Sequence, residues 1–370
     1  MTRIGVDARL NAYRQGGIAQ YTRQLLGAMA ALAPDLEFVA LQHYRQREPL
    51  AVGPNLRRAT MITPPHHRYE QLSLPFELWP HRLSLLHCPD FIAPRRRRCP
   101  AVITIHDLAF LHYPDILDAD ARRFYAQIRA AAHDADGVIT VSEATRNDIV
   151  SLLDLPAEQI TVIYEAADPS FQPLGLRPDA TRTINGRQLT ATSFLLFVST
   201  IEPRKNLETL LHALRLLLDR DPGGPYQLVA AGAPGWLDAP IYRLVRELHL
   251  AEHVWFTGKV AHDELIWLYN ACRLYLNPSL YEGFGLPVLE ALACGAPTIV
   301  ADTSSLPEIV GKAGICVPPQ DPVAWADTIA SLWHDEAART ALARRGPPHA
   351  ARFTWQRAAQ ATLAVYQSLL

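Results

Sequence analysis

The sequence predicts two α/β domains, each built on a parallel sheet that helices cover on both faces. Short runs rich in Val, Ile and Leu alternate with longer segments of helical period along the chain. These apolar runs lack the alternation of a half-exposed strand, which is typical of strands buried on both faces. The 370 residues exceed what a single hydrophobic core usually serves. Prolines and polar residues interrupt the pattern between 165 and 190, which indicates the boundary.

The candidate strands form two series, one on each side of this interruption. They are 3–7, 36–41, 84–88, 101–105, 137–142 and 160–163, then 194–199, 226–231, 253–257, 273–277 and 297–301. The candidate helices are 18–33, 118–134, 143–153, 206–219, 238–249, 262–271, 287–294, 322–334, 336–351 and 354–368. We therefore expect one domain at 1–170, with 352–370 packing back on it, and a second at 185–350.

Composition excludes several classes of protein. Hydrophobic residues make up 49% of the chain and charged residues 19%, which is typical of a well-packed globular protein. A net charge of −2 gives no general attraction to nucleic acid. No apolar run reaches the ~18 residues of a membrane span. The five cysteines form no CxxC pair, and a strand-like segment follows Met1 directly, so we expect a reduced, cytoplasmic chain without a signal peptide.

The most informative stretch runs from Glu282 to Glu290 and reads Glu-Gly-Phe-Gly-Leu-Pro-Val-Leu-Glu. Two carboxylates flank a glycine turn, and Pro287 is suited to the first turn of a helix. The N-terminus of a helix behind glycines binds anions readily. Carboxylates on either side suit the hydroxyl groups of a hexose and a ribose. The segment therefore predicts a site for a nucleotide sugar.

Further motifs follow the other predicted strands, where ligands of open parallel sheets bind. Taken along the chain, they are Gly16-Gly17-Ile18, His106-Asp107, Val141-Ser142-Glu143, the run Ser-Thr-Ile-Glu-Pro-Arg-Lys-Asn from Ser199 to Asn206, and Phe256-Thr257-Gly258. In this order, together with the Glu-x7-Glu stretch, they resemble the family 4 glycosyltransferases of the GT-B fold. Those retaining enzymes use sugar nucleotides, and their two Rossmann-like domains face a cleft. The likeness is greatest to the bacterial mannosyltransferase branch of lipopolysaccharide and exopolysaccharide synthesis.

The resemblance implies roles for individual residues. Catalytic roles fall to His106, Arg204, Lys205 and Glu282, with the two basic residues holding the donor diphosphate. Glu282 would contact the hexose and Glu290 the ribose. The implied donor-binding residues are Gly16, Gly17, Ser199, Thr200, Arg204, Lys205, Gly258, Lys259, Val260, Glu282, Gly283, Phe284, Gly285, Leu286 and Glu290. No metal and no other cofactor is expected, because Arg204 and Lys205 can neutralise the leaving group.

Several alternatives stay open at this stage. The donor is expected to be GDP-mannose, with UDP- and ADP-sugars as alternatives, and the acceptor a saccharide or a lipid-linked saccharide. The chain could instead be a sugar-nucleotide epimerase of the same fold, or a catalytically silent donor-binding subunit. Asp107 either orients the acceptor or caps the next segment, and Ser142 is expected to cap a helix. The run Arg95–Arg98 is either a solvated loop or a contact with anionic lipid on the inner face of the cell membrane.

Overall fold

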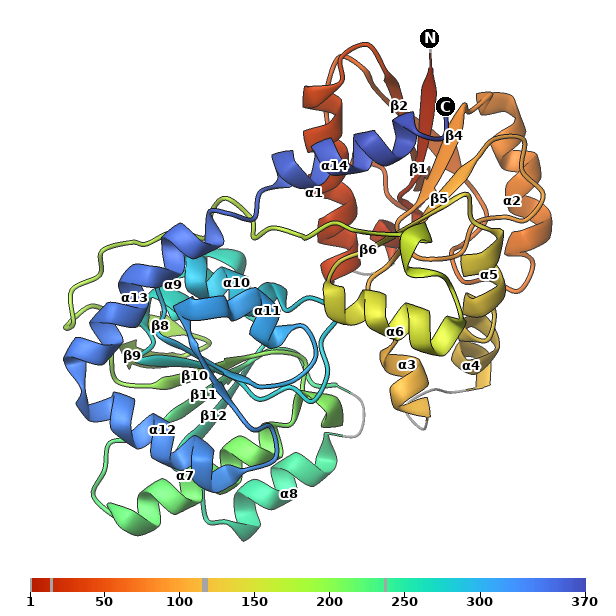
Figure 1. Ribbon diagram of the computed structural model, residues 1–370. Helices are drawn as coiled ribbons and strands as arrows, with labels where there is room; N and C mark the ends of the chain where they lie inside the picture. The colour runs from red at the N-terminus through yellow and green to blue at the C-terminus, as the bar shows by residue number, and fades with distance from the viewer. Residues whose placement is uncertain (1, 14–15, 115–118, 236–237) are drawn as a thin grey trace. The chain divides into compact units, whose positions relative to one another are not determined.

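The computed structural model describes residues 2–13, 16–114, 119–235 and 238–370, which divide into two compact units (Figure 1). The first unit comprises Met1–Ala166 and Phe353–Leu370, and the second Ala167–Arg352. Each unit has its own parallel sheet with helices on both faces, which confirms the predicted fold class. Within the described residues, no helix combines the length and apolar character needed to cross a bilayer.

The sheet of the first unit has the strand order β3-β2-β1-β4-β5-β6-β7, and all its pairs are parallel. The strands are β1 (Arg3–Asp7), β2 (Glu37–His43), β3 (Leu56–Met61), β4 (Leu85–Cys88), β5 (Ala101–Ile105), β6 (Gly137–Thr140) and β7 (Ile160–Val162). The helices are α1 (Gly17–Leu32), α2 (Glu70–Leu78), α3 (Ala109–His112), α4 (Ala119–Tyr125), α5 (Ile128–Asp134), α6 (Glu143–Leu153) and α14 (Trp355–Gln367). The C-terminal helix α14 packs against α1 (Figure 1).

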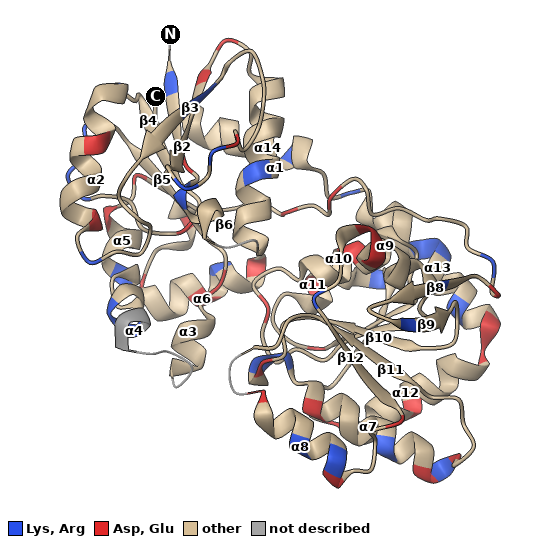
Figure 2. Ribbon diagram, turned by 180° about the vertical axis from the view of Figure 1, so that it is seen from behind, with Lys and Arg blue, Asp and Glu red and all other residues tan. Residues whose placement is uncertain are grey.

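The sheet of the second unit has the order β12-β11-β10-β13-β14-β15. Its strands are β10 (Leu195–Val198), β11 (Leu228–Ala231), β12 (Val254–Gly258), β13 (Leu274–Asn277), β14 (Thr298–Ala301) and β15 (Ile315–Val317), beside an antiparallel hairpin of β8 (Thr181–Ile184) and β9 (Arg187–Thr190). The helices are α7 (Leu207–Arg220), α8 (Ala239–Glu247), α9 (His262–Ala271), α10 (Leu286–Ala293), α11 (Leu306–Val310), α12 (Pro322–His334) and α13 (Glu336–Ala350). The central strands β10, β11, β13 and β14 carry no charged residue, and charges gather on helices and loops (Figure 2).

Two hydrophobic cores explain why the strands of the first unit read as continuous apolar runs. Ile4 and Val6 of β1 belong to the core that α1 and α14 cover, together with Tyr366. Ile103 and Ile105 of β5 belong to the core on the other face. Because both faces of the sheet are buried, neither set of positions is free to be polar.

The predicted elements need several corrections. The expected helix at 118–134 is two helices, α4 and α5, separated near Gln127. The interruption between 165 and 190 is not devoid of regular structure, because it contains β8 and the start of β9. The sequence patterns also missed β3, β15, α2, α3 and α11. β3 is an edge strand with the polar pattern Leu-Arg-Arg-Ala-Thr-Met, and α2 carries Pro75 inside the helix, so neither shows the expected period.

Candidate active site

The two motifs that frame the predicted donor site meet in the second unit where the strand order reverses. This reversal lies between β10 and β13, and the loops after these strands are hydrogen-bonded to each other. The backbone N–H of Leu280 donates to the carbonyl oxygen of Arg204 at 2.8 Å. Open parallel sheets bind ligands at such a point, beyond the carboxyl ends of the strands. The chain topology therefore brings the basic pair beside the Glu-x7-Glu segment.

Asn206 holds these two loops together. It follows a 3-10 turn at Pro203–Lys205 and has a left-handed backbone with φ of 55°, which asparagine tolerates better than most residues. Its side-chain amide donates to the carbonyl oxygens of Pro278 at 2.9 Å and Pro319 at 2.7 Å. Sequence reasoning gave Asn206 no role, although its place directly after the basic pair is the signal that could have found it.

The basic pair is already neutralised by carboxylates of the same unit. Lys205 Nζ lies 2.7 Å from Oε1 of Glu282, and Nε of Arg204 lies 2.7 Å from Oε1 of Glu202. One terminal nitrogen of Arg204 also donates to the carbonyl oxygen of Tyr281 at 3.1 Å and lies 3.7 Å from Glu282. The sequence predicts an anion beside these cations, and in the structure Glu202 and Glu282 supply that charge.

Glu282 is buried but stays ionised. Burial alone would raise the pKa of its carboxyl group, yet the charges of Lys205 and Arg204 outweigh burial and hold that pKa below its usual value. The hydroxyl of Ser279 adds a hydrogen bond of 2.8 Å to Oε1 of Glu282. A buried carboxylate with this many donors is fixed in position, so it can orient hydroxyl groups of a ligand.

Serines in the loop after β14 fix the backbone of the same segment. Glu282 donates its N–H to Oγ of Ser304 at 2.9 Å, and its carbonyl oxygen accepts from Oγ of Ser305 at 2.9 Å. Ser305 also donates to the carbonyl oxygen of Phe284. These serines were missed by sequence reasoning, because they lie more than twenty residues further along the chain and belong to no motif.

The glycine turn and the helix behind it form where the sequence predicts them. Gly285 has φ of 101°, and a β-carbon there would lie 3.2 Å from a side-chain carbon of Leu306. Helix α10 begins at Leu286 with Pro287 in its first turn, as the sequence predicts. Phe284 is buried, so its ring packs inside the unit. The backbone of Gly283 and Gly285 therefore leads directly into the start of α10.

Glu290 stands on α10 in a different environment from Glu282. It is buried, and it accepts a hydrogen bond of 2.9 Å from the hydroxyl of Tyr269 on α9. Burial raises the pKa of Glu290 to about 8, although the bond from Tyr269 opposes the rise, and the negative charge of Asp168 adds to it. Among the described residues, no basic side chain pairs with Glu290. At neutral pH this carboxyl group is therefore mostly protonated.

The predicted donor-binding segment Gly258–Val260 lies beside Asn185 in the β8–β9 turn. Its amide donates to the carbonyl oxygens of Thr257 at 2.8 Å and Lys259 at 3.3 Å, which flank Gly258 with its φ of 69°. The carbonyl oxygen of Gly258 accepts a hydrogen bond from the N–H of Gly232 at 3.0 Å. Val260 is the next residue after Lys259. These three hydrogen bonds hold the carbonyl groups of Thr257, Gly258 and Lys259 in place.

Ser199 and Thr200 follow β10, and the backbone at Gly232 and Gly235 packs closely against them. A β-carbon on Gly232 would lie 1.9 Å from the carbonyl oxygen of Ser199, and one on Gly235 would lie 2.9 Å from the side chain of Thr200. Both glycines are therefore required by packing. The two polar residues lie in the loop that leads to the basic pair. This loop and the segment of Glu282 both follow the carboxyl ends of strands, so they lie at the same edge of the sheet.

In the first unit, His106 follows β5 and has both ring nitrogens engaged. Nδ1 lies 3.0 Å from a carboxylate oxygen of Glu165, and Nε2 lies 2.9 Å from the carbonyl oxygen of Pro89. The carbonyl oxygen of Pro89 can only accept, so Nε2 donates to it, and Nδ1 faces the carboxylate of Glu165. Burial lowers the pKa of His106, but the hydrogen bond and charge of Glu165 raise it above its usual value. The edge of the ring packs on Tyr21, with centroids 4.7 Å apart.

Glu165 is the residue that sequence reasoning missed in this unit. It is buried directly after β7, 59 positions from His106, so no short motif connects the two. Its place at the end of a predicted strand was the available signal. The carboxylate orients the imidazole and raises its pKa.

The remaining predicted residues of the first unit lie at helix starts. Gly16 precedes α1, which begins at Gly17, and a β-carbon on Gly16 would meet no atom within 4 Å. Asp107 accepts from the N–H of Ala109, the first residue of α3, at 3.0 Å. Ser142 accepts from the N–H of Thr145, which confirms the predicted helix cap.

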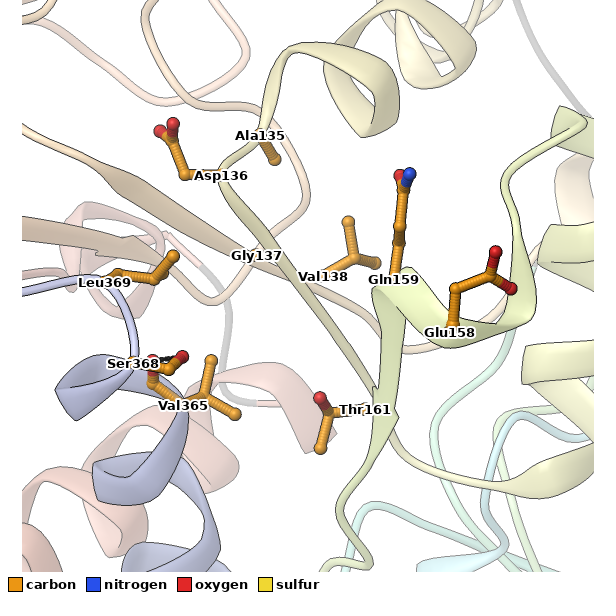
Figure 3. Close-up of a pocket in the computed structure, with 10 residues that line it drawn as sticks. All are labelled: Ala135, Asp136, Gly137, Val138, Glu158, Gln159, Thr161, Val365, Ser368 and Leu369. Carbon is orange, nitrogen blue, oxygen red and sulfur yellow. Dashed lines mark hydrogen bonds between the residues drawn. The ribbon is translucent and has the colours of Figure 1, made fainter.

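Cavities lined by described residues of the first unit include one beside α2 and one beside α14. One of about 630 Å³ is lined by residues around the start of α2 and on α4, including His66, Arg68 and Gln71. The other, of about 240 Å³, lies at the amino ends of β6 and β7 against α14, where Asp136 and Ser368 line it (Figure 3). Since His106 follows the carboxyl end of β5, the smaller cavity lies at the opposite edge of the sheet and is no part of this site.

Comparison with known proteins agrees with this geometry. The model of glycosyltransferase family 4 matches residues 15–171, and that of glycosyl transferases group 1 matches residues 185–348. The chain is 30% identical over 315 residues to the O-antigen chain mannosyltransferase B of Escherichia coli, which is 85% of this chain and 82% of that protein. It is 31% identical over 255 residues to the serotype-specific mannosyltransferase WbdA of the same organism. These residues make up 68% of this chain but only 31% of WbdA.

The fold has solved counterparts. A sucrose-phosphate synthase from Thermosynechococcus elongatus superimposes with a TM-score of 0.79 at 22% identity, over 100% of this chain and 99% of that one. This likeness concerns the fold alone, which is GT-B. The family is shown by the sequence comparisons: the 30% identity to a relative that is covered over most of its length and the two family models identify the chain as a member of the family 4 glycosyltransferases and as a hexosyltransferase.

Proposed function

We propose that this protein is a retaining mannosyltransferase. It would move mannose from GDP-mannose to a saccharide or lipid-linked saccharide during the synthesis of a cell-surface polysaccharide. The names of two relatives, both mannosyltransferases, support the sugar and the pathway. The observation that carries the reaction is the cluster of Arg204, Lys205 and Glu282 at the switch point of the second sheet.

The basic pair would stabilise the leaving group. When the bond between the anomeric carbon and the diphosphate breaks, negative charge grows on the phosphate oxygens and positive charge on the sugar ring. Arg204 and Lys205 now face carboxylates, and a diphosphate would take over that charge as a stronger and more extended anion. The carboxylate of Glu282 would then accept hydrogen bonds from the hydroxyl groups of the hexose. The acceptor hydroxyl would attack from the face that the diphosphate leaves, and its proton would pass to a diphosphate oxygen.

Glu290 would hold the ribose. A carboxyl group with a pKa of about 8 can both donate and accept hydrogen bonds at neutral pH, which suits a pair of neighbouring hydroxyls. The backbone from Gly258 to Val260 would contact the base. The donor-binding residues of the second unit would thus contact successive parts of the nucleotide sugar, from its base to its hexose.

We further propose that no divalent metal takes part. The basic pair can supply the charge that a metal would bring to the diphosphate. The Asp-x-Asp sequence from Asp219 to Asp221 lies at the far end of α7, which starts directly after Asn206 and is 14 residues long. That end lies roughly 20 Å from the basic pair. These aspartates therefore have no position from which to share a metal with the diphosphate.

The test is turnover of the purified chain with GDP-mannose and a mannose-terminated oligosaccharide on a lipid-like aglycone. We expect GDP release that depends on the acceptor, and a product whose new linkage has the anomeric configuration of the donor. Glu282→Gln should lose most of this turnover. Release of UDP or ADP from the corresponding sugar nucleotides instead would correct the donor, and an inverted product would refute retention.

The same panel separates the alternatives. An epimerase would change the sugar of the nucleotide without needing the acceptor. A silent donor-binding subunit would bind GDP-mannose without releasing GDP. Binding is measured independently by thermal shift, where a ligand at 100 times its dissociation constant stabilises the fold by about 2.7 kcal/mol.

A further inference from the structure

Helix α2 of the first unit exposes an apolar face. Four large side chains at the helix and the turn before and after it are exposed: Tyr69 by 50%, Leu72 by 62%, Phe76 by 73% and Trp79 by 56%. Spacings of three and four residues place all four on one side of the helix. The opposite side carries Leu74, which is buried in the core. We call these four residues the α2 face.

Such a cluster is unusual on the surface of a soluble unit. Single exposed apolar residues are common, but contiguous patches with aromatic rings mark surfaces that bind something. The helix itself is firmly attached, because the carboxylate of Glu70 in its first turn is paired with the buried Arg9. The α2 face is therefore a fixed feature of the first unit and not the result of a frayed helix.

A basic loop borders this face. Arg95, Arg96 and Arg98 are exposed, and the guanidinium carbon of Arg98 lies 3.8 Å from the centre of the Trp79 ring. The backbone N–H of Arg95 donates to the side chain of Gln71 on α2 at 3.0 Å, which ties the loop to the helix. Figure 2 shows basic residues in the loop next to α2. This loop is the arginine run whose role the sequence left open.

The acidic groups around the face are engaged elsewhere. Asp134 and Asp136 pair with Arg97, the one arginine of the run whose side chain is mostly buried. Glu77 accepts from the backbone N–H groups of Ile62 and Thr63. In the described part of the chain, no ion pair joins Arg95, Arg96 or Arg98 to a carboxylate. The border of the α2 face is thus positively charged, although the whole chain has a net charge of −2.

We propose that the α2 face and the loop Arg95–Arg98 dock the first unit on an anionic lipid surface. Tryptophan, tyrosine and phenylalanine enter the boundary between headgroups and acyl chains, and arginines beside them pair with lipid phosphates. An apolar strip with basic flanks is complementary to such a surface on both counts. The cavity of about 630 Å³ is lined by Arg68 and Gln71 at the same helix, so a docked membrane would lie beside it. Docking does not depend on the donor or the sugar.

The experiment is co-sedimentation of the full chain with vesicles, in the absence of sugar nucleotide. One set contains phosphatidylcholine alone, and the other phosphatidylcholine and phosphatidylglycerol in equal amounts. We expect binding to the anionic vesicles that weakens with salt, and little binding to the neutral ones. The double variants Leu72→Ser/Phe76→Ser and Arg95→Glu/Arg96→Glu should each weaken binding by roughly tenfold or more.

Matched controls keep the test specific. Val52→Ser removes an apolar side chain that is 91% exposed elsewhere in the same unit, and Arg344→Glu/Arg345→Glu reverses another adjacent pair of exposed arginines. Both should bind as the unaltered chain does, and all variants should keep its unfolding temperature. Equal binding to neutral vesicles, an equal loss in the Arg344/Arg345 variant, or no vesicle binding at all would overturn the proposal. The last result would favour a protein partner for the face.

Discussion

Replacing Glu290 with glutamine tests the unusual ionisation of the second unit. The carboxyl group is buried, and its pKa is raised from 4.5 to about 8. A group whose pKa is higher in the folded state stabilises the fold while it is protonated. This contribution to the free energy of unfolding is lost as pH rises through the folded pKa. The unaltered protein should therefore become less stable as pH rises from about 4.5 to about 8. The Glu290→Gln variant, which cannot titrate, should lack this contribution.

The size of the effect follows from the two pKa values. Each pH unit between them lowers the free energy of unfolding by about 1.4 kcal/mol, so the full interval corresponds to on the order of 5 kcal/mol. Between pH 6 and pH 8, the unaltered protein should lose roughly 2 kcal/mol relative to Glu290→Gln. The amide of glutamine preserves the shape of the side chain and can still accept the bond from Tyr269.

Urea unfolding at several pH values measures this difference. Tryptophan fluorescence reports largely on the unit concerned, which contains Trp255, Trp267, Trp325 and Trp333. Glu247→Gln on α8 is the matched control, because Glu247 is exposed and its replacement should leave the pH dependence unchanged. If Glu290→Gln and the unaltered protein lose stability in parallel between pH 6 and pH 8, the carboxyl group is not protonated in the fold and the reasoning fails.

Three other predictions concern the reaction. Arg204→Ala and Lys205→Ala should each cost about 2–4 kcal/mol of transition-state stabilisation, seen mostly in kcat, and unchanged kinetics in both variants would contradict their role at the diphosphate. Activity should survive EDTA, whereas a loss that manganese restores would show that a metal is required. Glu165→Gln should lower the pKa of His106 as followed by NMR titration of the imidazole, because it removes the negative charge that raises it; a midpoint that stays in place would refute that coupling.

Most of the fold could be predicted because its signal is local. The strands β1 and β5 match the expected ranges, since buried parallel strands are short, apolar and bounded by polar residues. β3 and α2 were not predicted, because neither shows the local pattern of its type. β3 is an edge strand with two arginines, and α2 is a helix that keeps Pro75 and exposes Phe76. In both cases the tertiary position decides the structure, and the local pattern does not reveal it.

The candidate site could be predicted only where its residues belong to motifs. The chain topology joins the segments of Lys205 and Glu282, whose positions after predicted strands indicated the same edge of the sheet. Their direct contact could not be foreseen, and neither could the difference between Glu282 and Glu290. Two glutamates eight positions apart read alike in the sequence. One meets a lysine and the other a tyrosine, and only packing determines which.

The protonation of the candidate residues bears on how the acceptor hydroxyl loses its proton. Both ring nitrogens of His106 are engaged, one with the carboxylate of Glu165 and the other with the carbonyl oxygen of Pro89, so neither is free to act as a base. Glu282 is ionised, but Lys205 holds it and lowers its basicity, and Glu290 is mostly protonated at neutral pH. None of these three groups is thus prepared to accept a proton. In the reaction proposed above, the departing diphosphate would therefore accept the proton, and each of these residues would hold or orient a ligand within its own unit.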